Sequence, residues 1–395
     1  MNFIELTENG GLFCDGDWIE KKDQDPNGTV RLIQLADIGV CEFKNKSARF
    51  LTRQKCEELR CTYLKKGDIL IARLPEPLGR ACIFPLEGEY ITAVDIAILR
   101  IENIEVNNKY LLYLINSPAF RNVIKQYETG TTRKRISRRN LEKINFKLPS
   151  LEEQNRIVDE IEKSFSQLDN GVETLKKTKE QLKVYRQAVL KEAFSTFVDK
   201  DKIRNMASIV TSGSRGWAKY YADEGARFIR ITDLTRDKIT LKNDSIQRVN
   251  LPENIEGKRS KLMENDVLVS ITADLGSIAL IPEEIEEAYI NQHIAMIRFY
   301  NSNQGEFMAW YLKSDLGQKD LLKNKRGGGK LGLGLDDIRD TPVPVVSDSV
   351  AMEVVNDIDS KLSVCDSIEQ TVDFVLQQAE ALRQSILKKA FEGDI

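Results

Sequence analysis

The sequence has few of the residues on which catalytic and metal sites depend. It holds a single histidine, His293, and six cysteines scattered over 395 residues. One histidine with apolar neighbours is typical of a packed or surface side chain rather than of a general base. Scattered cysteines in a large chain indicate reduced, mostly buried thiols, and we expect neither a disulfide framework nor a metal site. These cysteines are Cys14, Cys41, Cys56, Cys61, Cys82 and Cys365.

Long apolar runs and common enzyme motifs are also missing. No stretch approaches 18 uninterrupted apolar residues, and the N-terminus has no basic region followed by an apolar run, so we expect a cytoplasmic protein without a membrane segment. The glycine-rich run 327–334 lacks P-loop spacing, and Ser212–Gly216 lacks the spacing of a nucleophile elbow. The chain has no methyl-donor glycine motif and no Asn/Asp-Pro-Pro-aromatic motif of amino-methylating enzymes. We therefore expect a non-catalytic chain with no cofactor of its own.

What the sequence does contain is a duplication. Arg186–Phe194 returns as Arg383–Phe391, at an offset of 383 − 186 = 197 positions, and the match runs without a gap back to Ser150 and Ser347. Upstream, the match is looser and its offset is 198, as between 67–72 and 265–270. Each half is thus a variable segment of about 150 residues followed by a better-matched segment of about 50. A repeat of this period predicts two similar lobes about a pseudo-twofold axis.

The better-matched segments have the pattern of long amphipathic helices. Apolar residues recur at spacings of three and four, with Lys179 and Arg186 interrupting, and no proline occurs between Ser150 and Ile203. A helix of about 40 residues would be on the order of 60 Å long. Matching seams predict that the two helices pair as a coiled coil, and the alternative is that each packs on its own lobe. The predicted seam residues are Phe165, Leu168, Val172, Leu175, Leu182, Val189, Leu362, Cys365, Val372, Leu376, Ala379 and Ile386.

The variable segments combine both kinds of secondary structure. Short β-branched or apolar runs at 68–72, 96–101 and 267–271 predict strands, because Gly, Asp or Pro bounds them. The segments 110–115 and 119–127 predict short helices, and 306–312 is the counterpart of the first. Each lobe is therefore expected to be α+β.

Basic segments provide the clearest binding signal, although the net charge is −3. Affinity for nucleic acid depends on the local potential rather than on the total charge. Segment 129–139 combines glycine and hydroxyls with Arg133, Lys134, Arg135, Arg138 and Arg139 on a predicted loop, and the equivalent place in the second half holds Lys323, Lys325, Arg326 and Lys330. A third cluster holds Arg215, Lys219 and Tyr220. A solvated charged loop is an equally good interpretation of either basic loop alone, but two at equivalent repeat positions favour DNA.

Three segments resemble the specificity subunit of type I restriction-modification enzymes. Leu148–Val158 is similar to the entry into that family's first conserved helix, Arg186–Phe194 to its end, and Ser212–Tyr221 to the opening of a target recognition domain. The resemblance covers essentially the whole chain. Val346–Ala351 departs from it, because the Pro-Leu-Glu-Glu-Gln pattern of the first half is missing there. Local contacts at this point are expected to differ, but not the helix.

The resemblance implies two α/β target recognition domains, at 1–148 and 200–346, that each read one half of a bipartite site in double-stranded DNA. Conserved helical regions at 149–199 and 347–395 would form an antiparallel coiled coil that spaces the domains and docks two modification subunits. Those subunits would carry S-adenosylmethionine and methylate adenine, and restriction subunits, which are ATP-dependent translocases and nucleases, can join. The alternatives are a coiled-coil scaffold whose lobes bind protein and an enzyme with an unrecognised site.

Overall fold

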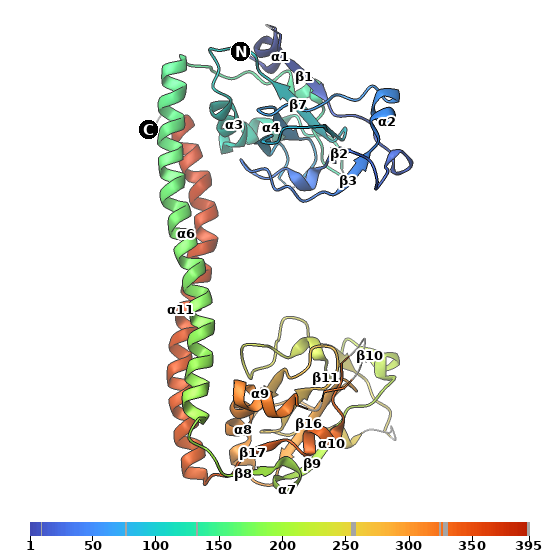
Figure 1. Ribbon diagram of the computed structural model, residues 1–395, viewed down its shortest axis with the longest axis vertical. Coiled ribbons are helices and arrows are strands. Elements are labelled where there is room, and N and C mark those ends of the chain that lie inside the picture. Colours follow the sequence, from blue (N-terminus) through green and yellow to red (C-terminus); the bar gives the residue numbers. More distant parts are fainter. Residues whose placement is uncertain are drawn as a thin grey trace. The chain divides into compact units, whose positions relative to one another are not determined.

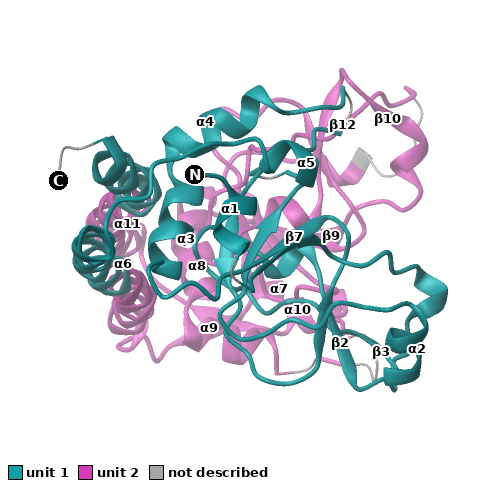
Figure 2. Ribbon diagram, turned by 90° about the horizontal axis from the view of Figure 1, so that it is seen from above, with its two compact units in different colours: residues 1–174, 374–395 teal, residues 175–373 magenta. Residues whose placement is uncertain are grey.

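The chain forms two compact units in the computed structural model, which describes residues 1–8, 10–75, 77–131, 133–253, 258–323, 325–326 and 331–392 (Figure 1). Unit 1 comprises residues 1–174 and 374–395, and unit 2 comprises residues 175–373 (Figure 2). Both boundaries between the units, at 174/175 and 373/374, fall inside long helices. Each unit therefore contains one mixed lobe together with a part of each helix, and the four-segment division predicted from the sequence remains a prediction.

The lobe of unit 1 contains two small sheets and short helices. Its central sheet has the order β1-β7-β4-β5, and a second sheet has the order β3-β2-β6 with a parallel β2–β6 pair. The strands are β1 (Leu12–Asp15), β2 (Val30–Ile33), β3 (Arg49–Leu51), β4 (Ile69–Ala72), β5 (Ala81–Ile83), β6 (Tyr90–Thr92) and β7 (Ile96–Arg100). The helices are α1 (Phe3–Thr7), α2 (Arg53–Glu58), α3 (Asn108–Asn116), α4 (Pro118–Gln126) and α5 (Arg138–Leu141).

The lobe of unit 2 repeats this topology. Its central sheet has the order β14-β13-β16-β9, and its second sheet, β10-β12-β11-β15, keeps the parallel pair as β11–β15. The strands are β8 (Lys200–Lys202), β9 (Ala207–Ser212), β10 (Tyr221–Ala222), β11 (Ala226–Ile229), β12 (Arg248–Val249), β13 (Val267–Ser270), β14 (Ile278–Leu280), β15 (Ala288–Ile290), β16 (Ile294–Phe299) and β17 (Pro342–Pro344). The helices are α7 (Ile203–Met206), α8 (Gly305–Lys313), α9 (Asp315–Leu321) and α10 (Leu335–Arg339). The structure thus confirms the strands predicted at 68–72, 96–101 and 267–271. It also confirms the short helices predicted at 110–115, 119–127 and 306–312 and the α+β fold class.

An identical ion pair sits in both central sheets. In unit 1, Arg100 donates from Nε and Nη2 to the two carboxylate oxygens of Asp68, each at 2.7 Å. In unit 2, Arg298 makes the same bidentate contact with Asp266, at 2.8 and 2.6 Å. Both aspartates are buried. A buried carboxylate needs such a partner, so the repeat preserves a core feature and not only a surface pattern.

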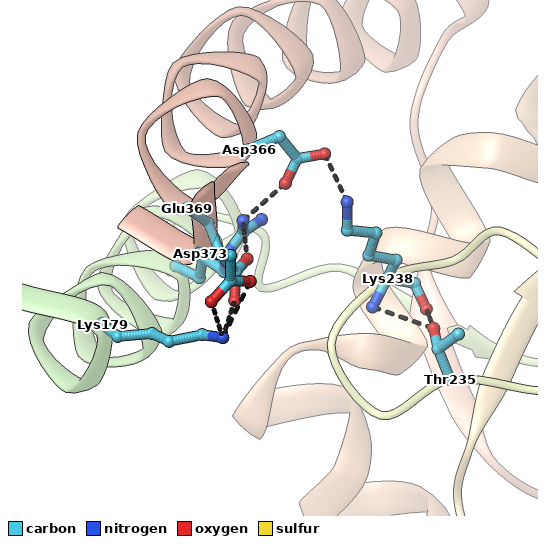
Figure 3. Close-up of polar contacts among 7 residues, drawn as sticks. Lys179, Thr235, Lys238, Asp366, Glu369 and Asp373 are labelled. Carbon is cyan, nitrogen blue, oxygen red and sulfur yellow. Dashed lines mark hydrogen bonds and ion pairs between the residues drawn. The ribbon is translucent and has the colours of Figure 1, made fainter. Parts of the chain in front are cut away.

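The long helices are α6 (Leu151–Phe194) and α11 (Asp348–Glu392). Within unit 2 they run antiparallel, because Lys179 pairs with Asp373 at 2.7 Å whereas Arg186, further along α6, pairs with the earlier Asp366 at 2.5 Å (Figure 3). Of the predicted seam residues, Phe165, Val189, Leu362, Cys365, Val372 and Ala379 are buried, and Leu168, Val172, Leu175, Leu182, Leu376 and Ile386 are half-buried.

One expectation about the seam is wrong. Arg186 does not interrupt it as a solvated residue: its side chain is buried and donates to Asp366 and Glu369. The repeat places the same contact in unit 1, where Arg383 pairs with Asp169 and stacks on the ring of Phe165 at 4.9 Å. The aliphatic stem of an arginine packs like an apolar side chain while its charged end finds a carboxylate. An arginine at a seam position is therefore part of the interface between the helices.

The two lobes attach to their helices through different glutamines. In unit 1, the buried Gln154 of α6 accepts from the Asn107 amide at 2.9 Å and donates to the Glu105 and Pro149 carbonyls. Its counterpart in α11 is Ala351. In unit 2, Gln304 of the lobe donates instead to the Val346 carbonyl and to Asp348, at 3.0 and 2.9 Å. The departure of Val346–Ala351 from the first half thus changes the local contacts and leaves the helix intact, as expected.

Candidate nucleic-acid interface

The basic segment of unit 1 is a tight turn with exposed cations. Thr129 and Arg135 exchange two backbone hydrogen bonds of 2.9 Å. Between them, Gly130 has a φ of 96°, and a Cβ there would lie 2.4 Å from the Arg133 carbonyl oxygen, so only glycine fits. Arg133, Lys134 and Arg135 project from this turn and are exposed, whereas Thr132 lies outside the described residues.

The five cations of this segment do not share one environment. Arg138 and Arg139 were expected on a loop, but they open α5, because the Ser137 side chain accepts from the Asn140 amide and caps that helix. Arg138 lies 3.5 Å from Asp15 and also pairs with Glu142, and Lys134 pairs with Glu128 at 2.7 Å. The hydrogen bond that Lys134 donates to the Glu128 carboxylate raises the pKa of Lys134. Within the described part of the chain, Arg133, Arg135 and Arg139 have no ion-pair partner, so these three guanidinium groups are the best placed for an external anion.

Unit 2 contains the counterpart of this turn. Arg326 and Gly332 exchange backbone hydrogen bonds of 3.0 and 2.8 Å, at the positions that the repeat offset of 197 assigns to Thr129 and Arg135. Lys325 and Arg326 are exposed, and Arg326 pairs with Asp337 at 2.8 Å. Lys330 and Gly327–Gly329 lie outside the described residues. The two basic segments are thus closed by equivalent backbone bridges.

The third predicted cluster lines a hollow of about 750 Å³ in unit 2. Arg215, Lys219 and Tyr220 all lie around it, and the Lys219 ammonium sits 4.9 Å above the Tyr220 ring. Sequence reasoning missed two further lining residues, Arg259 and Gln292. Neither carries a local signal, because each reaches the hollow only through the folding of distant segments.

His293 connects the two clusters of unit 2. Its Nδ1 lies 2.6 Å from the Thr272 hydroxyl and its Nε2 lies 2.9 Å from the Gln292 amide nitrogen. Gln292 lines the hollow, and Thr272 pairs with Gly332 at the base of the basic turn. Both ring nitrogens are thus engaged with neutral groups, which suits a structural role better than proton transfer.

Cysteines and carboxylates form neither a disulfide nor a metal site within the described ranges. All six cysteines are unpaired, and burial raises the pKa of Cys41, Cys61 and Cys82 to about 12, so these thiols stay protonated near neutral pH. No group of three or more potential metal ligands occurs among the described residues. No described helix is at once long and apolar enough to cross a membrane.

Comparison with known proteins identifies the family of the chain. The family described as type I restriction modification DNA specificity domain matches residues 5–184 and 217–363. The chain belongs to this family. The resemblance seen in the sequence is thereby confirmed, and the family's part in restriction and modification is DNA specificity rather than catalysis.

Two similar curated proteins are named as type I specificity subunits. The chain is 25% identical over 327 residues to the type I restriction enzyme EcoBI specificity subunit of Escherichia coli, covering 75% of this chain and 68% of that one. It is 24% identical over 314 residues to the StySPI specificity subunit of Salmonella potsdam, covering 73% and 66%. The matches thus span about two thirds of these relatives.

The fold is shared with two solved structures. One chain, from work on complex assembly and conformational transition of the type I R-M system, has a TM-score of 0.70 at 17% identity and covers 98% of both chains. The HsdS subunit from Thermoanaerobacter tengcongensis has a TM-score of 0.51 at 16% identity and covers 98% of this chain and 97% of that one.

Proposed function

We propose that this chain selects the DNA sequence for a type I restriction-modification complex by contacting a bipartite, asymmetric site with its two lobes. The observation that carries the proposal is the pair of equivalent basic turns, closed by the Thr129–Arg135 and Arg326–Gly332 bridges. Two basic segments closed by equivalent bridges suit two halves of a duplex that share a backbone geometry. The side chains on these turns differ, which favours two half-sites of different sequence.

Contacts to DNA are assigned to the exposed cations. In unit 1 these are Arg133, Arg135 and Arg139, with Lys134 and Arg138 shared between DNA and their protein carboxylates. In unit 2 they are Lys325 and Arg326 on the basic turn and Arg215 and Lys219 at the hollow. The half-buried Tyr220 at the hollow and Lys330, which lies outside the described residues, are assigned to DNA as well. Lysine and arginine on tight turns can approach phosphates closely, and arginine forks can also contact guanine.

The long helices are assigned to spacing and docking. Helices of 44 and 45 residues are each about 66 Å long at 1.5 Å per residue. Their seam is held by buried apolar residues and by the Arg186 and Arg383 ion pairs, which favours a rigid element of constant length. On this proposal the outer faces of the two helices dock two modification subunits, which bind S-adenosylmethionine and methylate adenine. Restriction subunits join through them, and this chain needs no cofactor.

Methylation sequencing tests the proposal directly. Cells that lack other methyltransferases would express this chain together with its modification subunit, or the modification subunit alone. We expect methylated adenines in one two-part motif with a constant gap, and only when both proteins are present. Methylation that does not depend on this chain would contradict the proposal, and methyl transfer by the purified chain alone would identify an enzyme instead.

A gel shift separates DNA binding from the scaffold alternative. The complex of this chain with modification subunits should shift a duplex that contains the sequenced motif more strongly than a scrambled duplex of equal length. Assembly with the modification subunits but equal affinity for both duplexes would favour a scaffold whose lobes bind protein.

A further inference from the structure

The hollow in unit 2 gathers three cations from two separate parts of the chain. Arg215 and Lys219 come from the segment that follows β9, and Arg259 comes from the short helix at Lys258–Ser260. All three residues are exposed. Arg259 donates from Nε to the Thr211 hydroxyl at 3.2 Å, which orients its guanidinium group and leaves the two terminal nitrogens for another acceptor.

Among the described residues that line the hollow, no carboxylate balances this charge. The described lining residues contain no aspartate or glutamate, and none of the three cations forms an ion pair within the described ranges. Elsewhere in the same lobe, the half-buried Arg248 pairs with Glu286 at 2.7 Å, and the exposed Arg204 pairs with Asp340 at 2.9 Å. Three like charges around one hollow repel one another, so the arrangement is stabilised when an anion enters.

The wall of the hollow is closely packed at Trp217 and Gly213. Trp217 is buried against Tyr289 and Phe228, with ring centroids 5.3 and 5.7 Å away. Gly213 passes so close to the neighbouring strand that a Cβ would lie 1.8 Å from the Ile290 carbonyl oxygen. This crossing holds the Ser212–Trp217 turn against β15, so the position of Arg215 is fixed by backbone packing.

The equivalent place in unit 1 has the opposite chemistry. The repeat puts Asp15, Gly16, Asp17 and Trp18 where unit 2 has Ser212, Gly213, Ser214 and Arg215. Asp15 already pairs with Arg73 at 3.3 Å and with Arg138, and Asp17 accepts from the Thr62 amide at 3.0 Å. Carboxylates repel phosphates, so the described residues at this place in unit 1 form no counterpart of the cationic hollow.

We infer that the hollow of unit 2 binds phosphodiester groups of the DNA backbone, with Arg259 as a binding residue beside Arg215 and Lys219. The inference rests on the proposed function and deepens it, because it adds to the contacts of the basic turns a phosphate site in the lobe of unit 2. A phosphate contact positions the protein without selecting the base sequence. We therefore expect the half-site bound by unit 2 to have an additional phosphate contact that does not depend on the base sequence.

Salt-dependent binding by the complex with modification subunits tests this inference. Arg259→Ala should weaken binding about tenfold near 0.1 M salt, both to the duplex with the sequenced motif and to a scrambled duplex. It should also reduce the slope of log affinity against log salt by about 0.9, the value for one lost phosphate contact. Arg259→Lys should restore most of the slope. The methylated motif should not change.

Arg204→Ala is the matched control, because Arg204 is an exposed arginine of the same unit that pairs with Asp340 at 2.9 Å. It should leave affinity and slope unaltered. If the wild-type complex binds DNA and Arg259→Ala keeps its affinity and slope, the phosphate site is wrong while the proposed function stands. A change of the methylated motif would instead assign Arg259 to base recognition. If the wild-type complex does not bind the motif at all, the proposed function itself fails.

Discussion

At the scale of single residues, position in the fold divides the cations into those with protein partners and those without. Arg138 and Arg139 are adjacent in sequence, yet Arg138 contacts Asp15 and Glu142 whereas Arg139 has no ion pair in the described part of the lobe. An arginine that is already neutralised releases few counterions when DNA binds. Its contribution to the salt dependence should therefore be small.

Replacing Arg133, Arg135 and Arg139 together with alanine should weaken DNA binding and reduce the salt slope by up to about 2.7, that is, about 0.9 for each phosphate contact. The measurement is a salt titration of the complex with a fluorescent duplex. Arg138→Ala is the comparison and should reduce the slope by less than one full contact, because Arg138 is shared between DNA and its two carboxylates. A loss of about 0.9 in this variant would show that the ion pairs with Asp15 and Glu142 open when DNA binds.

At the scale of elements, the repeat places equivalent contacts in environments of different burial. Arg186 and Arg383 are counterparts, but the side chain of Arg186 is 9% exposed and that of Arg383 is 30% exposed. Removing one partner of a buried pair leaves uncompensated charge in a poorly hydrated place. The two positions therefore form a natural matched pair for measuring how burial changes the effect of one ion pair.

We expect Arg186→Ala to lower the free energy of unfolding by about 2–3 kcal/mol and Arg383→Ala to lower it by about 1 kcal/mol or less. Urea denaturation followed by circular dichroism would measure both. Equal losses would contradict the assignment of the difference to burial, and Arg186→Met, which keeps the packed stem, should recover part of the loss.

A second pair of equivalent contacts lies where α3 and α8 meet the long helices. In unit 1, Lys109 pairs with Glu162 at 2.6 Å and Tyr113 donates to the same carboxylate. The counterparts in unit 2 are Glu306, Trp310 and Asp359, which line one hollow of about 320 Å³ together with Arg186, Lys238 and Asp366. A lysine–glutamate pair has thus become two facing carboxyl groups. Partial burial is the main cause that raises the pKa of Glu306, and the neighbouring carboxyl group of Asp359 raises it further. Partial burial also raises the pKa of Asp359.

The sign of the pH effect follows from these raised pKa values. The stability that this pair contributes is fully present at pH values below the ordinary pKa values of 4.5 for Glu306 and 3.8 for Asp359. It is lost as the pH rises through the raised pKa values of the folded protein. Glu306→Lys restores the charge pattern of unit 1. It should raise the melting temperature by about 1–3 °C at pH 8 and by less at pH 5. Glu306→Gln is the control for removal of charge alone, and a gain that did not depend on pH would contradict the carboxyl-pair explanation.

At the scale of the whole molecule, the duplication separates two tasks. The segments that match best form α6 and α11, whose seams must fit each other, and the segments that match poorly form lobes with a common topology and different surfaces. Faithful repetition suits docking to two copies of one partner, and divergence suits the recognition of two different DNA sequences.

Inserting one heptad after Leu175 and another after Val372 should lengthen the pair of helices by about 10 Å, or about three base pairs of DNA. Methylation sequencing should then find the same two half-sites with a gap that is longer by about three base pairs. Four-residue insertions at the same places break the heptad and should abolish methylation. A methylated motif with its original gap in the heptad variant would disprove the spacing role.

The sequence alone determined the features that depend on local periodicity and on the repeat: the two lobes, the strands at 69–72 and 96–100, the long helices and their apolar seam. The strands, the long helices and the seam follow from local periodicity, and the two lobes follow from the repeat. Both kinds of pattern can be recognised in the sequence itself. Only the tertiary structure decided which cations lack partners, that Arg186 belongs to the seam, and that Arg259 and Gln292 join Arg215 at one hollow. Burial and ion pairing depend on residues that are distant in sequence, so no local pattern encodes them.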